Sequence, residues 1–346
     1  VKAVDPDNYF YAEAWTPGGG SSGDRIAERA VQEALAGTGI GTFNDRIRNP
    51  LQQMALINGG NVDAIRAGLA GNLKDFKLKT KSGAVINAST VGAYNLDPQE
   101  AINYVEKHDN ETLWDWMHRP GALPSDMSLA NRVRVDSLTL SVPVLSQGVP
   151  FIQMGTDLLR SKSMSPNSYN AGDWFNKVDF TKQSNNWNVG LPLAQDNQSA
   201  WDSIKTIANN PNTTAYPEHI ELGGAVFQDF LKIRHSSKLF RLTSGKDVMD
   251  RVGFHNIGKN LTQGLIVMSI DDGMGLTDID PAHDAVVVVI NGTSSEKTHK
   301  VPTAQGFSLH QVQQDSDDSR VSEARFIAQG ADGSFVVPAF TMAVFV

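Results

Sequence analysis

Short apolar runs that end in polar residues recur along the first part of the chain. Residues 9–12 form an aromatic run that ends at Glu13, and residues 102–105 form an apolar run that ends shortly before Asp109. A buried barrel strand that delivers a carboxylate to the rim of an active site has this pattern. We therefore predict a strand at each place, with Glu13 and Asp109 at the carboxyl ends.

Segments with helical spacing separate these strands. Residues 61–69 and 129–145 are predicted helices, and residues 24–35 are predicted to form a helix or a wide helical turn. Residues 148–155 are a further predicted buried strand. Residues 224–239 are predicted to form an amphipathic helix, whose core-facing side chains are Val226, Phe227, Phe230, Leu231 and Ile233. Strands that alternate with helices in this way are typical of part of an α/β barrel.

The pattern changes after about residue 246. Short β-rich runs follow one another, at residues 252–255, 265–270, 285–290, 336–337 and 342–346. Asp-Gly and Asn-Gly turns separate them, which predicts a small antiparallel β-sandwich. The predicted fold class is therefore α/β plus all-β, with a partial (β/α)8 barrel over residues 1–245 and the sandwich over residues 246–346.

Composition narrows the function classes. The hydrophobic fraction of 40% and charged fraction of 20% describe an ordinary globular protein with a sizeable core. A net charge of -8 argues against nucleic acid or an anionic membrane as the main partner. The chain contains no cysteine, so disulfides and thiolate chemistry are excluded. The location of the protein in the cell stays open.

Metal and phosphate sites have little support in the sequence. The eight histidines lack the spacing of a transition-metal site, so we predict none. Residues 315–319, Asp-Ser-Asp-Asp-Ser, lack the Gly and terminal Glu of a calcium loop and are predicted to be a solvated turn. Residues 37–43 are dense in glycine, but no Gly-Lys-Ser/Thr follows them, so a nucleotide loop is not predicted.

The two carboxylates at strand ends indicate sugar chemistry. Glycosidases cleave with a pair of carboxylates. Glu13 follows an apolar run and stands near Trp15, surroundings that raise a carboxyl pKa and suit a general acid. Asp109 lies between His108 and Asn110, polar neighbours that favour an ionised carboxylate. Either acid alone is more often a surface residue, and the pair at two strand ends makes a catalytic role the better hypothesis.

Several longer motifs resemble one family. YFYAEAW, GTGIGTFNDRIR, NYVEKHDNETLWD, LSQGVPFIQMGTDLLRSKS and SYNAGDWFNKVDF are together similar to pullulanases and limit dextrinases. These enzymes are the α-1,6-cleaving debranching branch of the α-amylase superfamily. The resemblance runs over essentially the whole chain. It implies the C-terminal half of a (β/α)8 barrel, strands five to eight, followed by a C-terminal antiparallel β-sandwich.

The resemblance also implies roles for particular residues. Glu13 resembles the general acid/base after strand five, and His108 and Asp109 resemble the pair after strand seven that holds the ring and stabilises the transition state. Trp15 matches the aromatic residue that follows the acid. The other matches are substrate-binding residues of the loops after strands six and eight: Phe43, Asn44, Asp45, Arg160, Tyr169, Asp173, Trp174 and Asn176. One departure is that alanines flank Glu13 where the family commonly has glycines.

The family's nucleophile is an Asp two residues after an Arg at the end of strand four, and that region is expected to precede Val1. Arg134-Val-Asp136 has the same spacing, but it falls inside the predicted helix 129–145, away from the strand ends where barrels carry catalytic groups. We therefore expect the nucleophile to be missing from this chain.

The resemblance implies a retaining hydrolase of α-1,6 linkages in branched α-glucans, which are pullulan, limit dextrins, and oligosaccharides of starch or glycogen. No cofactor is required, although a structural Ca²⁺ is compatible with the family, and the full-length protein is expected to be a monomer. Two alternatives stay open. The chain could be an inactive truncated remnant that still binds α-glucans, or a boundary artefact with no function of its own.

Overall fold

The structure is a computed structural model that describes residues 3–15, 30–273 and 275–346. Residues 24–29, the first half of the predicted helix 24–35, lie outside these residues. Its described end contains α1 (Gln32–Leu35). Within the described ranges, no helix is both long and apolar enough to cross a membrane.

A four-stranded parallel sheet lies near the N-terminus. Its strands are β1 (Tyr11–Ala12), β2 (Gly41–Phe43), β5 (Ala101–Asn103) and β6 (Val149–Pro150), and their order in space is their order in the chain. β1 and β6 fall within predicted strands but are shorter, and β5 overlaps its predicted strand but begins one residue earlier. The sequence analysis missed β2, because its glycine-dense sequence lacks a strand pattern. Gly41 is needed there, since a Cβ atom at this position would lie 1.9 Å from the Tyr9 hydroxyl.

The helices cover this sheet and fill the middle of the molecule. Helix α6 has the predicted bounds, and its N-cap Ser128 accepts a hydrogen bond from the Asn131 backbone N–H. Helix α4 begins one residue later than predicted, after its N-cap Asn61. The main helices are α2 (Asp45–Gln52), α3 (Ala55–Asn58), α4 (Val62–Leu69), α5 (Leu113–Met117), α6 (Leu129–Leu145), α9 (Trp201–Ala208) and α10 (Pro217–Ser236).

Helix α10 is longer than predicted and begins at a proline, a residue favoured at the first helical position. Phe230 and Ile233 face the core as expected. The prediction for Leu231 is wrong, because its side chain is 44% exposed. Leu231 follows Phe230 by one position, which turns it about 100° around the helix and out of the buried stripe.

Two antiparallel sheets make up the C-terminal part. One has the order β13-β9-β8-β7 and the other β10-β12-β11. Their strands are β7 (Val252–Phe254), β8 (Leu265–Asp271), β9 (Ala285–Asn291), β10 (Lys297–Val301), β11 (Arg325–Gln329), β12 (Asp332–Val337) and β13 (Thr341–Phe345). The sequence analysis missed β10 and β11, since their outward positions are polar or exposed. A separate hairpin pairs β3 (Lys77–Lys79) with β4 (Val85–Asn87).

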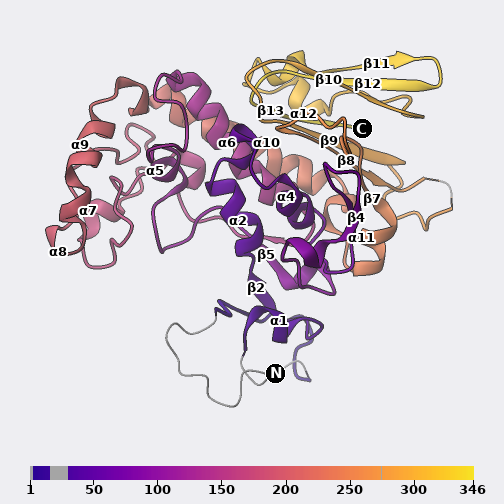
Figure 1. Cartoon of the computed structure of the whole chain (residues 1–346), viewed down its shortest axis with the longest axis horizontal. Coiled ribbons are helices and arrows are strands. Elements are labelled where there is room, and N and C mark those ends of the chain that lie inside the picture. Colours follow the sequence, from indigo (N-terminus) through magenta and orange to yellow (C-terminus); the bar gives the residue numbers. More distant parts are fainter. Residues whose placement is uncertain (1–2, 16–29, 274) are drawn as a thin grey trace.

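The larger antiparallel sheet is buried on both faces. Val267 and Phe345 join an apolar cluster that includes Phe335 of the smaller sheet, whereas Met268 and Val344 join the core formed with the helices. Figure 1 shows the arrangement, with β2 and β5 of the parallel sheet toward the N-terminal side, α6 and α10 in the middle, and the antiparallel sheets at the C-terminal side. Apolar packing is thus continuous across residue 245, and the domain boundary there stays a prediction.

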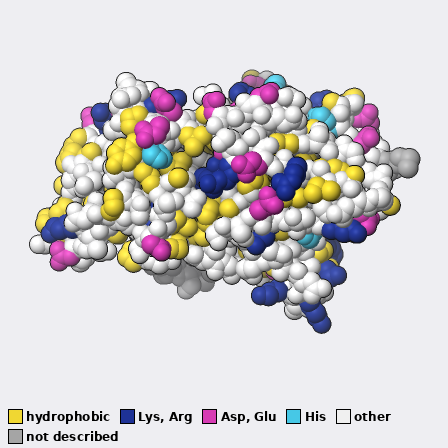
Figure 2. All heavy atoms as spheres, turned by 90° about the horizontal axis from the view of Figure 1, so that it is seen from above, with side chains coloured by type: hydrophobic (Ala, Val, Ile, Leu, Met, Phe, Trp, Pro, Cys, Tyr) yellow, Lys and Arg dark blue, Asp and Glu magenta, His cyan; other side chains and the backbone are white. Residues whose placement is uncertain are grey.

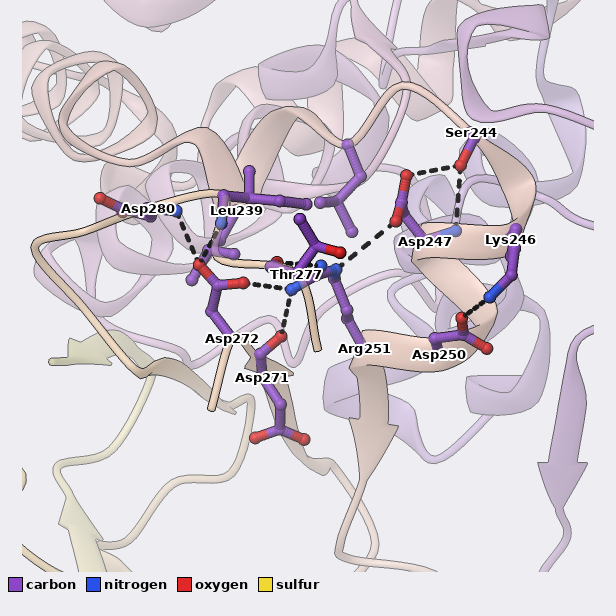
Figure 3. A network of polar contacts seen from close by, with 12 residues as sticks. Leu239, Ser244, Lys246, Asp247, Asp250, Arg251, Asp271, Asp272, Thr277 and Asp280 are labelled. Atoms are coloured by element: carbon purple, nitrogen blue, oxygen red, sulfur yellow. Dashed lines mark hydrogen bonds and ion pairs between the residues drawn. The ribbon is translucent and has the colours of Figure 1, made fainter. Parts of the chain in front are cut away.

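A buried ion pair joins the helical part to the larger sheet. Arg251, at the end of α11 (Gly245–Arg251), pairs with Asp272, and both side chains are at most 2% exposed (Figure 3). Asp272 also accepts hydrogen bonds from the backbone N–H groups of Ile279 and Asp280, at 2.8 and 2.6 Å. Burial by itself raises the pKa of Asp272, but these donors and Arg251 outweigh it and lower the pKa below its usual value.

The short helices α7 (Asp173–Asn176), α8 (Ala194–Asn197) and α12 (Gln311–Gln314) belong to connecting segments. The first two lie in the long polar stretch after β6, far from the antiparallel sheets (Figure 1). On the face shown in Figure 2, acidic and basic side chains are interspersed. The net negative charge is therefore not gathered into one acidic patch on that face.

Candidate active site

Three of the predicted residues come together beyond the carboxyl ends of the parallel strands. Glu13 follows β1, and His108 and Asp109 follow β5; one ligand atom from each lies within 4.8 Å of the others. His108 Nε2 is 3.4 Å from Asp109 Oδ2 and 3.9 Å from Glu13 Oε1. Two carboxylates and an imidazole thus face one point from two separate strands.

The sequence analysis did not single out Lys107, which lies between the two acids. Its Nζ is 2.7 Å from Glu13 Oε1 and 2.7 Å from Asp109 Oδ2. The lysine side chain is only 4% exposed, while those of Glu13 and Asp109 are 48% and 60% exposed. The available signal was a lysine two positions after the apolar run 102–105, between that run and the polar residues 108–110, because a lysine in a buried segment is almost always paired.

The environment of Glu13 differs from the expected one. The sequence analysis placed it in apolar surroundings, but its side chain is about half exposed and is paired with an ammonium group. Asp109 agrees better with its expected polar neighbourhood. A hydrogen bond from Lys107 lowers the pKa of Asp109 below its usual value, and the charges of His108 and Lys162 act in the same direction.

The residues expected to bind substrate after β2 are mostly inside the protein. Phe43 packs edge-on against Tyr104, with ring centroids 5.2 Å apart. Asn44 is fully buried, and its Nδ2 donates to Asn103 Oδ1 at 2.8 Å. Asp45 is partly exposed and accepts a hydrogen bond at 2.9 Å from the side chain of Gln32. In this structure, Phe43 and Asn44 fix the strand ends rather than face solvent.

Trp15 is partly buried beside the same aromatic cluster. It packs against the buried group formed by Phe43, Ile102 and Tyr104. The guanidinium carbon of Arg48 lies 5.9 Å from the centroid of the Trp15 ring, a cation–π distance. Trp15 is therefore held close to the acid at position 13 by contacts to β2 and β5.

The five predicted residues of the loop after β6 divide into two groups. Arg160 is 7% exposed and donates to the Asn176 carbonyl at 3.0 Å, and Asn176 Nδ2 donates to the Ser168 carbonyl at 2.8 Å. These two side chains shape the loop. Tyr169, Asp173 and Trp174 are exposed instead, with exposed fractions of 81% for Tyr169 and 53% for Trp174. They are free to meet a ligand.

This loop is tied to the catalytic candidates by Lys162. Its Nζ donates to the His108 carbonyl at 3.1 Å, and its backbone N–H donates to Asp115 on α5 at 2.8 Å. Asp115 also accepts a hydrogen bond from the Ser161 hydroxyl, and burial raises its pKa to about 6. The position of His108 therefore depends on the fold of the loop after β6.

Acidic side chains gather at two places that resemble cation sites. The trio of Glu13, His108 and Asp109 has the donor atoms for an ion, but the ammonium of Lys107 already occupies the space between the two carboxylates. The prediction of a solvated turn at residues 315–319 is wrong at Asp318. That side chain is 11% exposed and forms an ion pair with Arg134.

Comparisons with known proteins identify the family. Residues 182–346 match the family model described as "Alpha-1,6-glucosidases, pullulanase-type, C-terminal". The chain is 36% identical to pullulanase of Klebsiella pneumoniae over 99% of its own length and 34% of that protein. It is 38% identical to chloroplastic pullulanase 1 of Arabidopsis thaliana, over 98% of this chain and 39% of that protein.

Solved structures agree with this result. The apo pullulanase of K. pneumoniae superposes with a TM-score of 0.90 at 36% identity, covering 99% of this chain and 40% of that one. The K. pneumoniae pullulanase complexed with maltotriose gives a TM-score of 0.89 at 36% identity, with 99% and 35% coverage. The fold is that of a glycoside hydrolase family with mixed helices and sheets. The chain belongs to the pullulanase family, as its motifs predicted, and spans between a third and two fifths of the length of these two curated relatives.

Proposed function

We propose that this chain is the C-terminal portion of an enzyme that hydrolyses α-1,6-glucosidic branch linkages. The observation that carries the proposal is the meeting of Glu13 and Asp109 from two strands of one parallel sheet. In a barrel of parallel strands, catalytic groups come from the carboxyl ends of several strands. The family relationship supports the choice of linkage.

The fold supports a matching proposal for the architecture. We infer that β1, β2, β5 and β6 are strands five to eight of a (β/α)8 barrel, because they are parallel and lie in chain order. The two antiparallel sheets would form the C-terminal β-sandwich, since apolar residues of both share one cluster. A boundary near residue 245 would then separate two parts that share an extensive interface.

The proposed mechanism is a double displacement with retention of configuration. Glu13 protonates the leaving glycosidic oxygen and, in the second step, removes a proton from the attacking water. Asp109, assisted by His108, binds ring hydroxyls more strongly as positive charge develops in the transition state. This scheme uses carboxylates alone, so we propose that neither an organic cofactor nor a metal ion takes part in the chemical steps.

The nucleophile in this proposal is an Asp outside the 346 residues. A retaining enzyme places it about 5–5.5 Å from the acid/base carboxyl. Asp136, which has the Arg-x-Asp spacing, lies in α6 and is 1% exposed, and burial raises its pKa well above its usual value. A carboxyl buried within a helix lies away from the strand ends where such barrels carry catalytic groups, which supports our choice of another residue.

The proposed substrate is a branched α-glucan such as pullulan, a limit dextrin, or an oligosaccharide of starch or glycogen. A relative of this chain has been solved as a complex with maltotriose, an α-glucan. The exposed rings of Tyr169 and Trp174 in the loop after β6 could stack on glucosyl units. We propose that the full-length protein acts as a monomer.

The test uses the full-length protein that contains this chain. Wild type is expected to release reducing ends from pullulan, and Glu13→Gln to be slower by about 10²–10⁴-fold, the contribution of a general acid. Glu13→Gln should still cleave a glucosyl fluoride in the first step, because fluoride leaves without protonation. Glu296→Gln, a change at an exposed acid outside the site, is the control. Pullulan hydrolysis by Glu13→Gln at the wild-type rate would refute the proposed role of Glu13. A wild-type protein that binds maltotriose but does not hydrolyse pullulan would favour a glucan-binding remnant.

A further inference from the structure

Lys107 reaches both acids from beneath the site. It ends a stretch of buried residues, 101–107, that continues β5, and its ammonium group meets carboxylates that are themselves about half exposed. Each bond uses one oxygen of its carboxylate, Oε1 of Glu13 and Oδ2 of Asp109. Lys107 therefore leaves the second oxygen of each carboxylate to other partners, including a substrate approaching from the solvent side.

The two acids need a positively charged group between them to stay close together. Their ligand atoms lie within 4.8 Å of each other, so two negative charges would repel and push the side chains apart. The charged groups that face Asp109 are Lys107 and His108 from its own segment, Glu13 from β1, and Lys162 from the loop after β6. Of the two lysines, Lys107 contacts both carboxylates, whereas the Lys162 ammonium bonds the carbonyl of His108.

We propose that Lys107 is a positioning residue that holds Glu13 and Asp109 at a fixed spacing through one ammonium bridge. This inference rests on the proposed function, because it concerns how the same two acids are kept ready for the reaction. Lys107 acts through the carboxylates and not on the sugar. The bridge joins residues 94 positions apart, and so it also fixes the end of β1 relative to the segment after β5.

The bridge has a consequence for pH dependence. The hydrogen bond from Lys107 lowers the pKa of Asp109, which keeps this group ionised to lower pH. Asp109 must be ionised to stabilise positive charge in the transition state. Removal of Lys107 is therefore expected to raise the pH below which activity is lost.

The first arm of the test measures kinetics on pullulan with the full-length protein. Lys107→Met is expected to lower kcat about 10²-fold, the effect of misplacing reacting groups by about 1 Å, with KM changed less than kcat. The acidic limb of its pH profile moves to higher pH. Lys107→Arg recovers part of kcat, and ethylammonium partly rescues Lys107→Ala, because a cation returns to the bridge. Lys205→Met, an exposed lysine on α9, is the control and keeps wild-type kinetics.

An unmoved acidic limb together with no rescue by ethylammonium would overturn the proposal, since a purely structural lysine gives this result. The second arm is independent of activity and compares crystal structures of wild type and Lys107→Met. We expect Lys107 within hydrogen-bond distance of both acids in the wild type, and the two carboxylates farther apart in the variant. If the wild type fails to cleave pullulan, the proposed function fails, while this crystallographic comparison still decides whether Lys107 positions the two acids. A wild-type lysine turned away from either acid would overturn the bridge.

Discussion

Arg134 on α6 forms a two-pronged ion pair with Asp318, which follows it by 184 positions in the chain. Its two terminal nitrogens lie 2.6 and 2.9 Å from the two carboxylate oxygens, and one of them also donates to Thr341 Oγ1 on β13 at 2.9 Å. The arginine of the Arg-x-Asp motif therefore anchors the central helix to the C-terminal sheet, and does not mark a catalytic strand end.

Replacement of this arginine should destabilise the protein. Both side chains are only about a tenth exposed, at 10% and 11%, so Arg134→Met leaves the Asp318 carboxylate unpaired in a poorly hydrated place. We expect a loss of about 3 kcal/mol in the free energy of unfolding. Urea denaturation measures it. The matched control is Arg325→Met, which breaks an exposed pair with Glu296 and should cost less than about 1 kcal/mol. Equal losses in the two variants would contradict the anchoring role.

Glu106 should make stability depend on pH near neutrality. Its buried carboxyl accepts hydrogen bonds from Thr156 and from the Leu113 backbone, but burial dominates and raises its pKa to about 7. Between its pKa in the unfolded chain, near 4.5, and this value, the folded protein holds more protons, so stability falls as pH rises. The full shift corresponds to about 3 kcal/mol.

Glu106→Gln removes this contribution and should flatten the decline of unfolding free energy between pH 4.5 and 8. The charge of Glu106 is one of the causes that raise the pKa of buried Asp136, so the substitution also lowers the Asp136 pKa and flattens the decline in the same direction. Urea titrations at several pH values provide the measurement, with Glu296→Gln as the exposed control. Parallel pH profiles for wild type and Glu106→Gln would show that Glu106 is not the group responsible.

Trp174→Ala should weaken glucan binding without unfolding the protein. The ring is 53% exposed, so its removal opens little space in the core. Loss of a stacking surface is expected to raise the dissociation constant for maltotriose about tenfold, or about 1.4 kcal/mol. Isothermal titration calorimetry measures this change. Phe180→Ala, which removes an aromatic ring 68% exposed in the same loop, should bind like the wild type. If Trp174→Ala and the wild type bound maltotriose with equal affinity, Trp174 would not be part of the binding site.

The polypeptide of residues 1–346 alone should hydrolyse pullulan negligibly. In the proposed mechanism the glucosyl-enzyme intermediate forms on an Asp that this chain does not supply, and Asp136 is buried in α6. Reducing-end assays on purified protein measure the rate, with a complete pullulanase as the positive control. Turnover at an ordinary rate would place the nucleophile within these residues.

The spacing of apolar residues along the chain predicted the elements that are long or strongly apolar. Helix α6 has the predicted bounds, since its apolar spacing and its Ser128 cap act together within one segment. The strands β8 and β9 were predicted because they are continuous apolar runs. Strands β2 and β10 were missed, as their pairing depends on neighbours distant in sequence: β2 lies between β1 and β5, and β10 pairs with β12.

The sequence by itself determined the family, the places of helices α4, α6 and α10, and the identity of the candidate acids, because motifs and periodicity are local properties of the chain. Only the tertiary structure decided what surrounds those acids. It placed Glu13 in partly exposed surroundings, buried Phe43 and Asn44, and brought Lys107 to 2.7 Å from each of two carboxylates. An ion pair across 94 positions leaves no periodic trace in sequence, since it forms only when separate strands are aligned in one sheet.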